Sequence, residues 1–306
     1  MKNFTFVIIT YNQEQFITQH FKSIIYQIKN YGLDVDNHII IADDCSSDQT
    51  VPVLKELLEE YRMFFKDIKL LVQKKNGGIV NNHISALKAI ETEYFKILAG
   101  DDMYYKNNIY SEIDGKSFNI CPTIMFNEEK SWVANDLFHK SLILRRDNLH
   151  KLNTYLEKNL RLHITPYAPS VFYNKSVVNA GLYDFLSQYH WIEDLPSYDY
   201  IYKNIKPRIT ISTVPLTLYR MNSGISTNAN HSKNIEFENE KILINKNICP
   251  RYKKNKYFNP YQYLKTANNY LDKARYKRSN DIKTMEECLL NINNEVEEYL
   301  NELENI

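Results

Sequence analysis

The acidic doublet Asp101-Asp102 is the first feature of this sequence that could carry out chemistry. It follows the strand-like run Lys96–Ala99 after a single glycine, in the stretch KILAGDD. Two like charges at the end of a buried strand repel each other and are costly to desolvate. Such a doublet therefore needs a cation nearby, or a strand end that is open to solvent.

Polar clusters follow three other strand-like segments in the same way. They are Thr10-Tyr11-Asn12, Asp43–Asp48 and Lys75–Gly78. In open α/β sheets, ligands bind at the carboxyl ends of the strands, near the point where the strand order reverses. Four such clusters suit a bound nucleotide, yet the sequence contains neither the glycine fingerprint GxGxxG nor the phosphate loop GxxxxGK[ST]. We therefore expect a carboxylate-held Mg²⁺ or Mn²⁺ to bind the diphosphate.

The elements that would position these clusters alternate along the first hundred residues. Apolar β-branched and aromatic runs predict strands at Phe4–Thr10, His38–Ala42, Ile68–Val72 and Tyr94–Leu98. Apolar residues at helical spacing predict helices at Glu14–Lys29, Gln49–Phe65 and Ile79–Ile90. Continuously apolar strands separated by helices are typical of a mostly parallel sheet with helices on both faces. The sequence thus predicts an α/β fold.

Beyond residue 102 the pattern is mixed. It predicts strands at Ile120–Phe126 and Lys206–Leu218, and short helical turns at Ser176–Gly181 and Pro196–Lys203. From about residue 231 the chain becomes helical and polar, and Asp281–Glu304 forms an acidic amphipathic helix. We expect a main domain over residues 1–230 and a helical C-terminal extension over residues 231–306.

Composition excludes several classes of protein. The net charge of +1 argues against a dedicated nucleic-acid binder, which would carry a clear basic excess. The 4 cysteines are scattered without a CxxC pair, so we expect reduced thiols and a cytoplasmic protein. The apolar stretch at the N-terminus is too short for a signal peptide, and no run of about 18 apolar residues is present to span a membrane.

Six segments, in order over roughly the first 230 residues, resemble family 2 glycosyltransferases with the A-type nucleotide-sugar-binding fold (GT-A). They are VIITYNQEQFI (Val7–Ile17), IIIADDCSSDQT (Ile39–Thr50), NGGIVNNHISALK (Asn76–Lys88), YFKILAGDD (Tyr94–Asp102), HWIEDLPSY (His190–Tyr198) and YRMNSGIS (Tyr219–Ser226). One such segment alone would be a weak signal because acidic doublets are common. The ordered set is specific.

The resemblance implies which residues would contact a UDP-sugar donor. These are Thr10, Tyr11, Asn12, Asp43, Asp44, Asn82, Asp101 and Arg220. Asp44 would hold the uracil or ribose, and Asp102 would be the direct metal ligand of a DXD-type motif. In this interpretation the metal and the diphosphate complete the charge balance of the doublet. The alternative for both acidic doublets is a solvated loop at a strand end.

Two positions in the late segment YRMNSGIS leave alternatives open. Arg220 would pair with the donor diphosphate or serve a structural role. Asn222 stands where many relatives carry histidine, and an amide offers neither a charge nor a good metal-binding nitrogen. A metal or phosphate role at position 222 is therefore not carried over.

The resemblance assigns the general base to the segment HWIEDLPSY. Inverting transfer needs an acceptor hydroxyl that loses its proton as it attacks the anomeric carbon. Asp194 matches the family's base, with Glu193 orienting donor or acceptor, while the metal stabilises the departing diphosphate. The alternative is that the pair only caps the helix predicted near Pro196.

The C-terminal extension also allows two interpretations. Its basic, tyrosine-rich stretch Arg251–Arg278 could rest on the inner face of an anionic membrane and reach a lipid-linked acceptor. Alternatively, the extension packs on the main domain or on a second copy of the chain. We favour packing, because anionic lipid would repel the acidic helix Asp281–Glu304.

The resemblance as a whole implies an inverting, metal-dependent enzyme. It would move a sugar from a UDP-sugar to a cell-surface polysaccharide, a lipid-linked glycan or another glycan acceptor. The rival hypothesis is a non-catalytic nucleotide-sugar-binding module with the same fold. The presence of Asp44, Asp101, Asp102 and Asp194 weighs against that rival.

Overall fold

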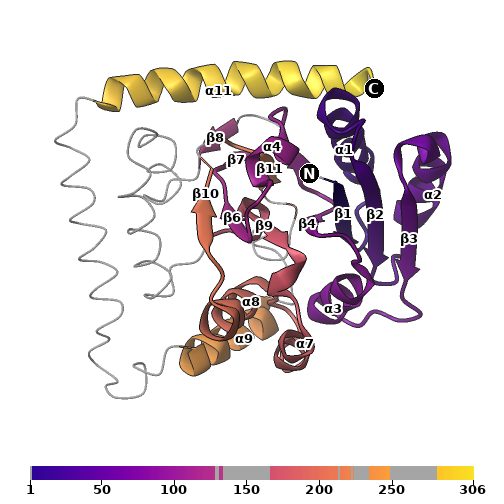
Figure 1. Ribbon diagram of the computed structural model, residues 1–306, viewed down its shortest axis with the longest axis vertical. Coiled ribbons are helices and arrows are strands. Elements are labelled where there is room, and N and C mark those ends of the chain that lie inside the picture. Colours follow the sequence, from indigo (N-terminus) through magenta and orange to yellow (C-terminus); the bar gives the residue numbers. More distant parts are fainter. Residues whose placement is uncertain are drawn as a thin grey trace.

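Figure 1 presents the computed structural model of the chain, which describes residues 2–127, 131–133, 166–212, 214–221, 223, 234–248 and 281–306. Alternating strands and helices build the first hundred residues. They are β1 (Asn3–Thr10), α1 (Ile17–Tyr31), β2 (Asp36–Asp43), α2 (Thr50–Glu60), β3 (Asp67–Val72), α3 (Ile79–Ala89) and β4 (Tyr94–Ala99). All four strands and three helices predicted in this region are confirmed, with small shifts at their ends.

These strands belong to a seven-stranded sheet of order β10-β6-β9-β4-β1-β2-β3. β1 pairs in parallel with β2 on one side and with β4 on the other. The connection through α3 therefore runs back past β1, and the strand order reverses between β1 and β4. The carboxyl ends of these two strands, with Thr10 on one and Gly100-Asp101 beyond the other, flank the point where such sheets bind ligands.

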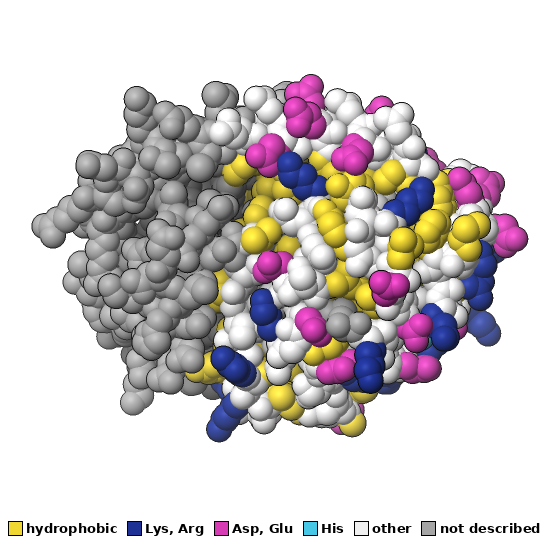
Figure 2. Space-filling view, turned by 45° about the horizontal axis from the view of Figure 1, so that its top comes forward, with side chains coloured by type: hydrophobic (Ala, Val, Ile, Leu, Met, Phe, Trp, Pro, Cys, Tyr) yellow, Lys and Arg dark blue, Asp and Glu magenta, His cyan; other side chains and the backbone are white. Residues whose placement is uncertain are grey.

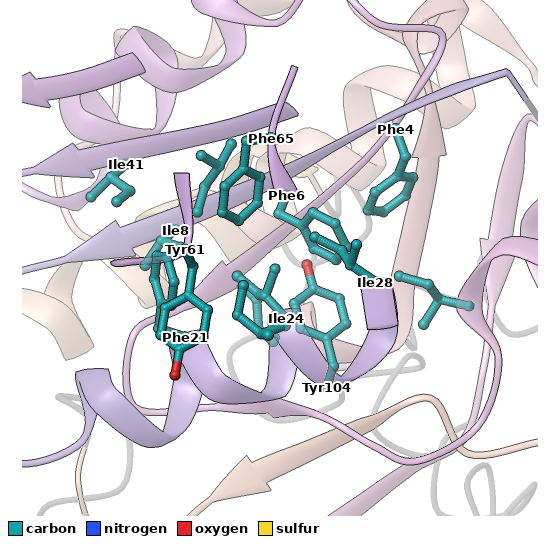
Figure 3. Packing of buried hydrophobic residues seen from close by; sticks show 14 of the residues in the cluster. Phe4, Phe6, Ile8, Phe21, Ile24, Ile28, Ile41, Tyr61, Phe65 and Tyr104 are labelled. Atoms are coloured by element: carbon teal, nitrogen blue, oxygen red, sulfur yellow. The ribbon is translucent and has the colours of Figure 1, made fainter. Parts of the chain in front are cut away.

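Helices cover both faces of the sheet, as the apolar strands predict. On one face, Phe21 and Ile24 of α1 pack against Phe4, Phe6 and Ile8 of β1 (Figure 3). On the opposite face, α3, α7 (Ala180–Leu186) and α8 (Asp194–Tyr200) contribute to a second core cluster. The first cluster fixes α1 beneath the ends of β1 and β4, and the second fixes α8, which begins with the predicted catalytic pair.

The second half of the chain completes the large sheet and adds a small one. The remaining strands are β5 (Met103–Tyr104), β6 (Phe118–Ile120), β7 (Thr123–Phe126), β8 (Ser131–Val133), β9 (Val171–Asn174), β10 (Ile209–Ile211) and β11 (Thr217–Arg220), and α4 is Ile109–Ile113. β9 is antiparallel to both of its neighbours, and the small sheet has the order β5-β11-β7-β8.

The prediction of single strands at Ile120–Phe126 and Lys206–Leu218 is wrong. The first range contains the end of β6 and then β7, and the second contains β10 and the start of β11, each pair lying in two different sheets. Pro122 and Pro215 interrupt these ranges, and a proline cannot donate to a ladder. The apolar pattern continues across both prolines and so conceals the step from one sheet to the other.

The predicted helical turns are longer than expected. Ser176–Gly181 overlaps a 3-10 turn at Lys175–Val177 and the start of α7, while Pro196–Lys203 falls within α8 and the π-helical turn Ile201–Ile205.

The C-terminal extension contains α9 (Asn234–Ile248) and α11 (Asp281–Glu304), and α11 has the bounds that its sequence predicts. α11 runs along the top edge of the molecule in Figure 1 and contacts α1 and β8. Its Val296, Tyr299 and Leu303 are buried in a cluster with Tyr26 and Met103. This apolar face is covered by the chain's own main domain, in agreement with the packing interpretation.

Figure 2 turns this edge toward the viewer. Acidic and basic side chains are interspersed there around apolar ones rather than gathered by sign. Within the described ranges, none of the helices combines the length and the apolar character needed to cross a bilayer. The basic stretch Arg251–Arg278 lies outside the described residues, so membrane contact stays a prediction, as does self-association through these helices.

Candidate active site

The loops that follow β1 and β2 are joined by hydrogen bonds. The backbone N–H of Asp44 donates to the Thr10 carbonyl at 3.0 Å, and that of Ser47 donates to Oδ1 of Asn12 at 2.8 Å. Asn12 (φ 51°) and Cys45 (φ 66°) both adopt the left-handed backbone conformation that favours glycine. Residues in such strained conformations persist only where the surrounding structure holds them. Here both residues lie in the loops that end two neighbouring strands.

Asp44 joins the end of β2 to the start of α3. Its Oδ1 accepts the N–H of Gly77 at 2.7 Å, and its Oδ2 accepts the N–H of Gly78 at 2.9 Å. Burial raises the pKa of Asp44, against these two hydrogen bonds and with a smaller contribution from the charge of Asp43. Each carboxylate oxygen can accept a second hydrogen bond, so Asp44 is held rigidly and keeps capacity for a ligand.

The other residues of this region that are predicted to contact the nucleotide sugar differ in solvent exposure. Tyr11 is 40% exposed, whereas Asp43 is fully buried and accepts the backbone N–H of Ser46 at 2.9 Å. Asn82 is also buried and donates to the Ala42 carbonyl at 2.7 Å. These contacts give Asp43 and Asn82 a part in holding the loops, and their contact with a donor stays a prediction.

The end of β11 and the residues after it form hydrogen bonds with the doublet Asp101-Asp102. The backbone N–H of Arg220 donates to Oδ1 of Asp102 at 2.9 Å, and its Nε donates to the Asp101 carbonyl at 3.0 Å. The Ser223 hydroxyl donates to Oδ2 of Asp101 at 2.6 Å. The doublet is 5% and 2% exposed, so the alternative of a solvated loop is wrong for this pair.

Arg220 is a cation in direct contact with the doublet. Its guanidinium lies between the rings of Phe16 and Phe126, at 4.6 and 4.4 Å from their centroids, and Nη2 donates to Gln19 at 2.6 Å. Stacking on two rings with a polar partner is a site that suits arginine rather than lysine. These contacts give Arg220 a structural role beside the doublet, and its contact with phosphate stays a prediction.

Lys96 supplies a second buried cation. It lies within β4, and its Nζ donates to the Ala168 carbonyl at 2.8 Å. Burial lowers the pKa of Lys96 to about 7, while the charges of Cys121 and Asp102 oppose this shift. Burial therefore works against the charged form of Lys96, and the charge of Asp102 works in its favour.

The two described cations beside the doublet, Lys96 and Arg220, do not balance its charge. Burial raises the pKa of Asp101, and burial together with the charge of Asp101 raises the pKa of Asp102 well above its ordinary range. The charges of Lys96 and Arg220 favour ionised Asp102 but do not cancel these effects. Within the described residues, no group of three His, Cys, Asp or Glu side chains could hold a metal by itself. A metal at this doublet would therefore need ligands beyond the His, Cys, Asp and Glu side chains of the described residues.

Polar oxygens without partners surround Gly100, the residue before the doublet. Thr10 Oγ1 and Gln13 Oε1 are buried, and neither has a hydrogen-bond partner in the part of the chain that the structure describes. A Cβ atom added to Gly100 would lie 3.2 Å from the first oxygen and 2.6 Å from the second. A side chain at this position would clash with Gln13 and Ile17, so glycine lets the backbone before the doublet lie close to both oxygens.

The second carboxyl pair, Glu193-Asp194, stands at the start of α8. Glu193 occupies the N-cap position without a capping hydrogen bond from its side chain, and Asp194 Oδ1 accepts the N–H of Leu195 at 2.6 Å. Both side chains are partly exposed. The Glu193 side chain therefore does not cap α8, whereas Asp194 binds one N–H at its start, so a capping role stays open for Asp194.

The two carboxyl groups of this pair have different surroundings. Burial, then the charge of Asp194 and, less strongly, that of Glu240, raise the pKa of Glu193 to about 8. Burial also raises the pKa of Asp194, but the N–H of Leu195 favours its ionised form. Two carboxyl groups whose environments separate their pKa values are suited to acid–base roles.

His190 joins the segment that precedes Glu193-Asp194 to the loop that begins α3. Its carbonyl accepts the N–H of Val80 at 3.2 Å, and a Cβ atom added to Gly78 would lie 2.4 Å from Cε1 of its ring. Gly78 has a φ of 86°, so only glycine allows both the backbone turn and this close approach. Gly78 thus contacts Asp44 on one side and His190 on the other.

Sequence reasoning missed three residues of the site. Gln13 and Ser223 lie inside the segments VIITYNQEQFI and YRMNSGIS, so the motif boundaries could have pointed to them. Glu240, described below, lies in the polar helix α9 and has no such signal. Asn222 and residues 224–226 of the late segment lie outside the described residues.

Comparison with known proteins agrees with this geometry. The chain matches the family described as "Glycosyl transferase family 2" over residues 5–166. It is 33% identical over 115 residues to the dTDP-rhamnosyl transferase RfbG of Shigella flexneri, covering 36% of this chain and 37% of that protein. It is 28% identical over 109 residues to the poly(ribitol-phosphate) beta-N-acetylglucosaminyltransferase TarS of Staphylococcus aureus, covering 36% of this chain and 18% of TarS. These matches span well under two thirds of either relative.

Solved structures of S. aureus TarS share the fold. The crystal structure of TarS 1–349 in complex with UDP-GlcNAc superposes with a TM-score of 0.54 at 21% identity, covering 80% of this chain and 65% of that one. The UDP complex gives a TM-score of 0.51 at 21% identity, covering 72% and 61%. The predicted GT-A-like architecture is confirmed. Since the family match covers more than half of the 306 residues, this chain belongs to glycosyl transferase family 2.

Proposed function

We propose that this protein is an inverting, metal-dependent glycosyltransferase that moves a sugar from a UDP-sugar to a cell-surface or lipid-linked glycan. Membership of family 2 supports the reaction class. The named activities of RfbG and TarS, and the UDP-GlcNAc complex of TarS, support a pyrimidine nucleotide sugar as donor. The free thiols of Cys45 and Cys121 are in keeping with a reducing compartment, and we propose that the reaction takes place in the cytoplasm.

One observation carries the proposal: two acidic pairs lie in this fold, one beside cations and the other beside a further carboxylate. Asp101-Asp102 is buried beside cations that do not neutralise it. Glu193-Asp194 is partly exposed and is influenced by a further carboxylate. A transferase that releases a diphosphate and deprotonates a hydroxyl needs one pair of each kind.

The donor pair fits a bound divalent cation. Mg²⁺ and Mn²⁺ take oxygen ligands, and Mg²⁺ commonly uses one or two protein carboxylates together with water and substrate phosphates. Asp102, with Asp101 beside it, would hold the ion. Burial raises the pKa of both residues, and an added cation would favour their ionised forms. When bound, the ion would neutralise charge on the leaving diphosphate.

The second pair would supply the base. Burial and the charge of Asp194 raise the pKa of Glu193, so Glu193 would hold a proton, while Asp194, whose ionised form is favoured by the N–H of Leu195, would accept a new one. The acceptor oxygen forms a bond to the anomeric carbon as the bond from that carbon to the diphosphate breaks. The hydroxyl proton passes to Asp194, and the bonding electrons leave with the nucleotide.

The test uses the full chain with a panel of donors that includes UDP-GlcNAc and dTDP-rhamnose. We expect nucleotide release with Mn²⁺, its loss on chelation, and its loss in Asp102→Ala and Asp194→Ala. NMR of the product's anomeric proton should show the configuration opposite to that of the donor. UDP binding by calorimetry without turnover for any donor would instead support the non-catalytic binding module.

A further inference from the structure

A carboxylate from the C-terminal extension binds the segment that carries the second acidic pair. Oε2 of Glu240, in α9, accepts the backbone N–H of His190 at 2.8 Å. Oε1 accepts the backbone N–H groups of Trp191 and Ile192, each at 2.8 Å. One side chain thus satisfies three successive backbone donors immediately before Glu193.

Such an arrangement fixes a backbone conformation. Hydrogen bonds from backbone N–H groups to a carboxylate are charge-assisted and stronger than those between neutral groups. The carboxylate is itself held in place, because Ile244, one turn further along α9, is fully buried in the core cluster that contains Leu182, Leu186 and Ile192. α9 also packs along α8. The turn at 190–192 is therefore held between α9 and the body of the protein.

Both sides of the site depend on the conformation of this turn. It leads directly into Glu193-Asp194 at the start of α8. Its first residue, His190, presses its ring against Gly78, whose N–H is bound by Asp44. A change of the turn would displace the acidic pair and remove the packing that covers Gly78.

We propose that Glu240 is a positioning residue of this transferase, which holds residues 190–192 so that Glu193 and Asp194 face the reacting groups. The inference rests on the proposed function, because that function assigns Glu193-Asp194 to proton transfer. The hydrogen bonds of the Glu240 carboxylate to the described residues all go to backbone N–H groups, so Glu240 would take no part in the chemical step. The charge of Glu240 also contributes to the raised pKa of Glu193, so the same side chain favours the protonated form of its neighbour.

The test compares two variants with a control from the same helix. Glu240→Ala removes all three acceptors. Glu240→Gln keeps one carbonyl oxygen, which can still accept from Trp191 and Ile192, but turns an NH₂ group toward the N–H of His190. The control is Glu238→Gln, which makes the same change of charge at an exposed position paired with Lys241 at 3.2 Å.

We expect kcat to fall about 10²-fold in Glu240→Ala, the effect of misplacing a catalytic group by about 1 Å. The kcat of Glu240→Gln should lie between that of Glu240→Ala and that of wild type, and the kcat of Glu238→Gln should equal that of wild type. The donor KM should change far less than kcat, as expected when an interaction of the transition state is lost. Amide hydrogen exchange of residues 190–192 should accelerate in Glu240→Ala, in protein shown to be folded by its thermal melting curve.

Two outcomes would overturn the inference with an active wild type. One is a kcat of both Glu240 variants within twofold of wild type. The other is a loss of kcat that follows the unfolded fraction, with donor KM and kcat changing together, since this indicates a role in folding alone. If Glu240→Ala does not fold, Glu240→Gln decides between these outcomes. A wild type without turnover for any donor would overturn the proposed function first, and the positioning role with it.

Discussion

Asp101-Asp102 and Glu193-Asp194 are both adjacent acidic residues, but their surroundings differ. The first pair follows a central strand, is almost inaccessible to water, and lies beside Arg220 and Lys96. The second begins a short helix at the surface, and the further charge that affects Glu193 is the negative one of Glu240. In both pairs the pKa values are raised.

The difference shows two ways in which a protein keeps like charges together. Around the first pair, Lys96 of the preceding strand and Arg220 of β11 offset part of the repulsion, and an external cation would offset the rest. Around the second pair, burial and the charge of Asp194 raise the pKa of Glu193, which favours relief of the repulsion by a proton, because two close carboxyl groups are not readily ionised together. The first arrangement suits binding of a metal diphosphate, and the second suits proton transfer.

The largest expected effect is the loss of activity when the proposed base, Asp194, is replaced. Asp194→Asn should lower kcat by about 10²- to 10⁴-fold, the usual contribution of general base catalysis. UDP affinity, measured by calorimetry, should remain close to that of wild type, because Asp194 belongs to the second pair. If Asp194→Asn weakened UDP binding as strongly as it lowered kcat, the two pairs would not have separate roles.

The next effect concerns the metal. Mn²⁺ with UDP should stabilise wild type by about 2.7 kcal/mol at a concentration one hundred times the dissociation constant, since a ligand of the native state shifts unfolding by mass action. Asp102→Asn should abolish the rise in melting temperature. Glu193→Gln serves as the matched control and should keep it. A rise that persists in Asp102→Asn would contradict the assignment of the metal to the first pair.

Sequence patterns predict the parallel half of the fold well, for a physical reason. Strands buried on both faces are apolar throughout, so Phe4–Thr10 and Tyr94–Leu98 are visible as short runs that end in polar clusters. The antiparallel half is less visible. Its strands are short, and the chain changes sheets at Pro122 and Pro215 without interrupting the apolar pattern.

The same distinction applies to the site. The sequence places Asp101-Asp102 at a strand end, because that position depends on local pattern. It does not reveal that the guanidinium of Arg220 lies between Phe16 and Phe126, since this contact joins three distant parts of the chain. Glu240 was invisible for the same reason: only the packing of α9 on α8 brings its carboxylate to the backbone of His190.

A smaller effect tests the protonation of the second pair through stability. The pKa of Glu193 rises from its ordinary 4.5 to about 8 on folding, so the native state binds the proton more tightly than the unfolded state. Stability from this group is complete below about pH 4.5 and is lost as the pH rises through about 8. Glu193→Gln cannot ionise. The melting temperature of Glu193→Gln, relative to that of wild type, should therefore increase as the pH rises from 5 to 8.5.

Glu238→Gln controls for the change in net charge, because its exposed side chain should follow wild type across this range. A constant difference between Glu193→Gln and wild type at every pH would mean that Glu193 is ionised throughout. The second pair would then resemble the first, and the contrast between them would disappear.

The smallest expected effect tests whether the two regions are mechanically linked through Gly78. Gly78→Ala introduces a side chain at a φ of 86° and would place its Cβ 2.4 Å from the ring of His190. Gly115→Ala is a close control, because Gly115 has a φ of 71° but nothing within 4 Å of its Cβ position. Both variants should lose roughly 1–3 kcal/mol of stability from backbone strain. In urea unfolding, Gly78→Ala should lose on the order of 1 kcal/mol more than Gly115→Ala, from overpacking against His190.

Because His190 is the first residue of the turn bound by Glu240, Gly78→Ala should also lower kcat, whereas Gly115→Ala should not. Equal losses of stability together with an unchanged kcat would show that the two acidic pairs are set independently of each other.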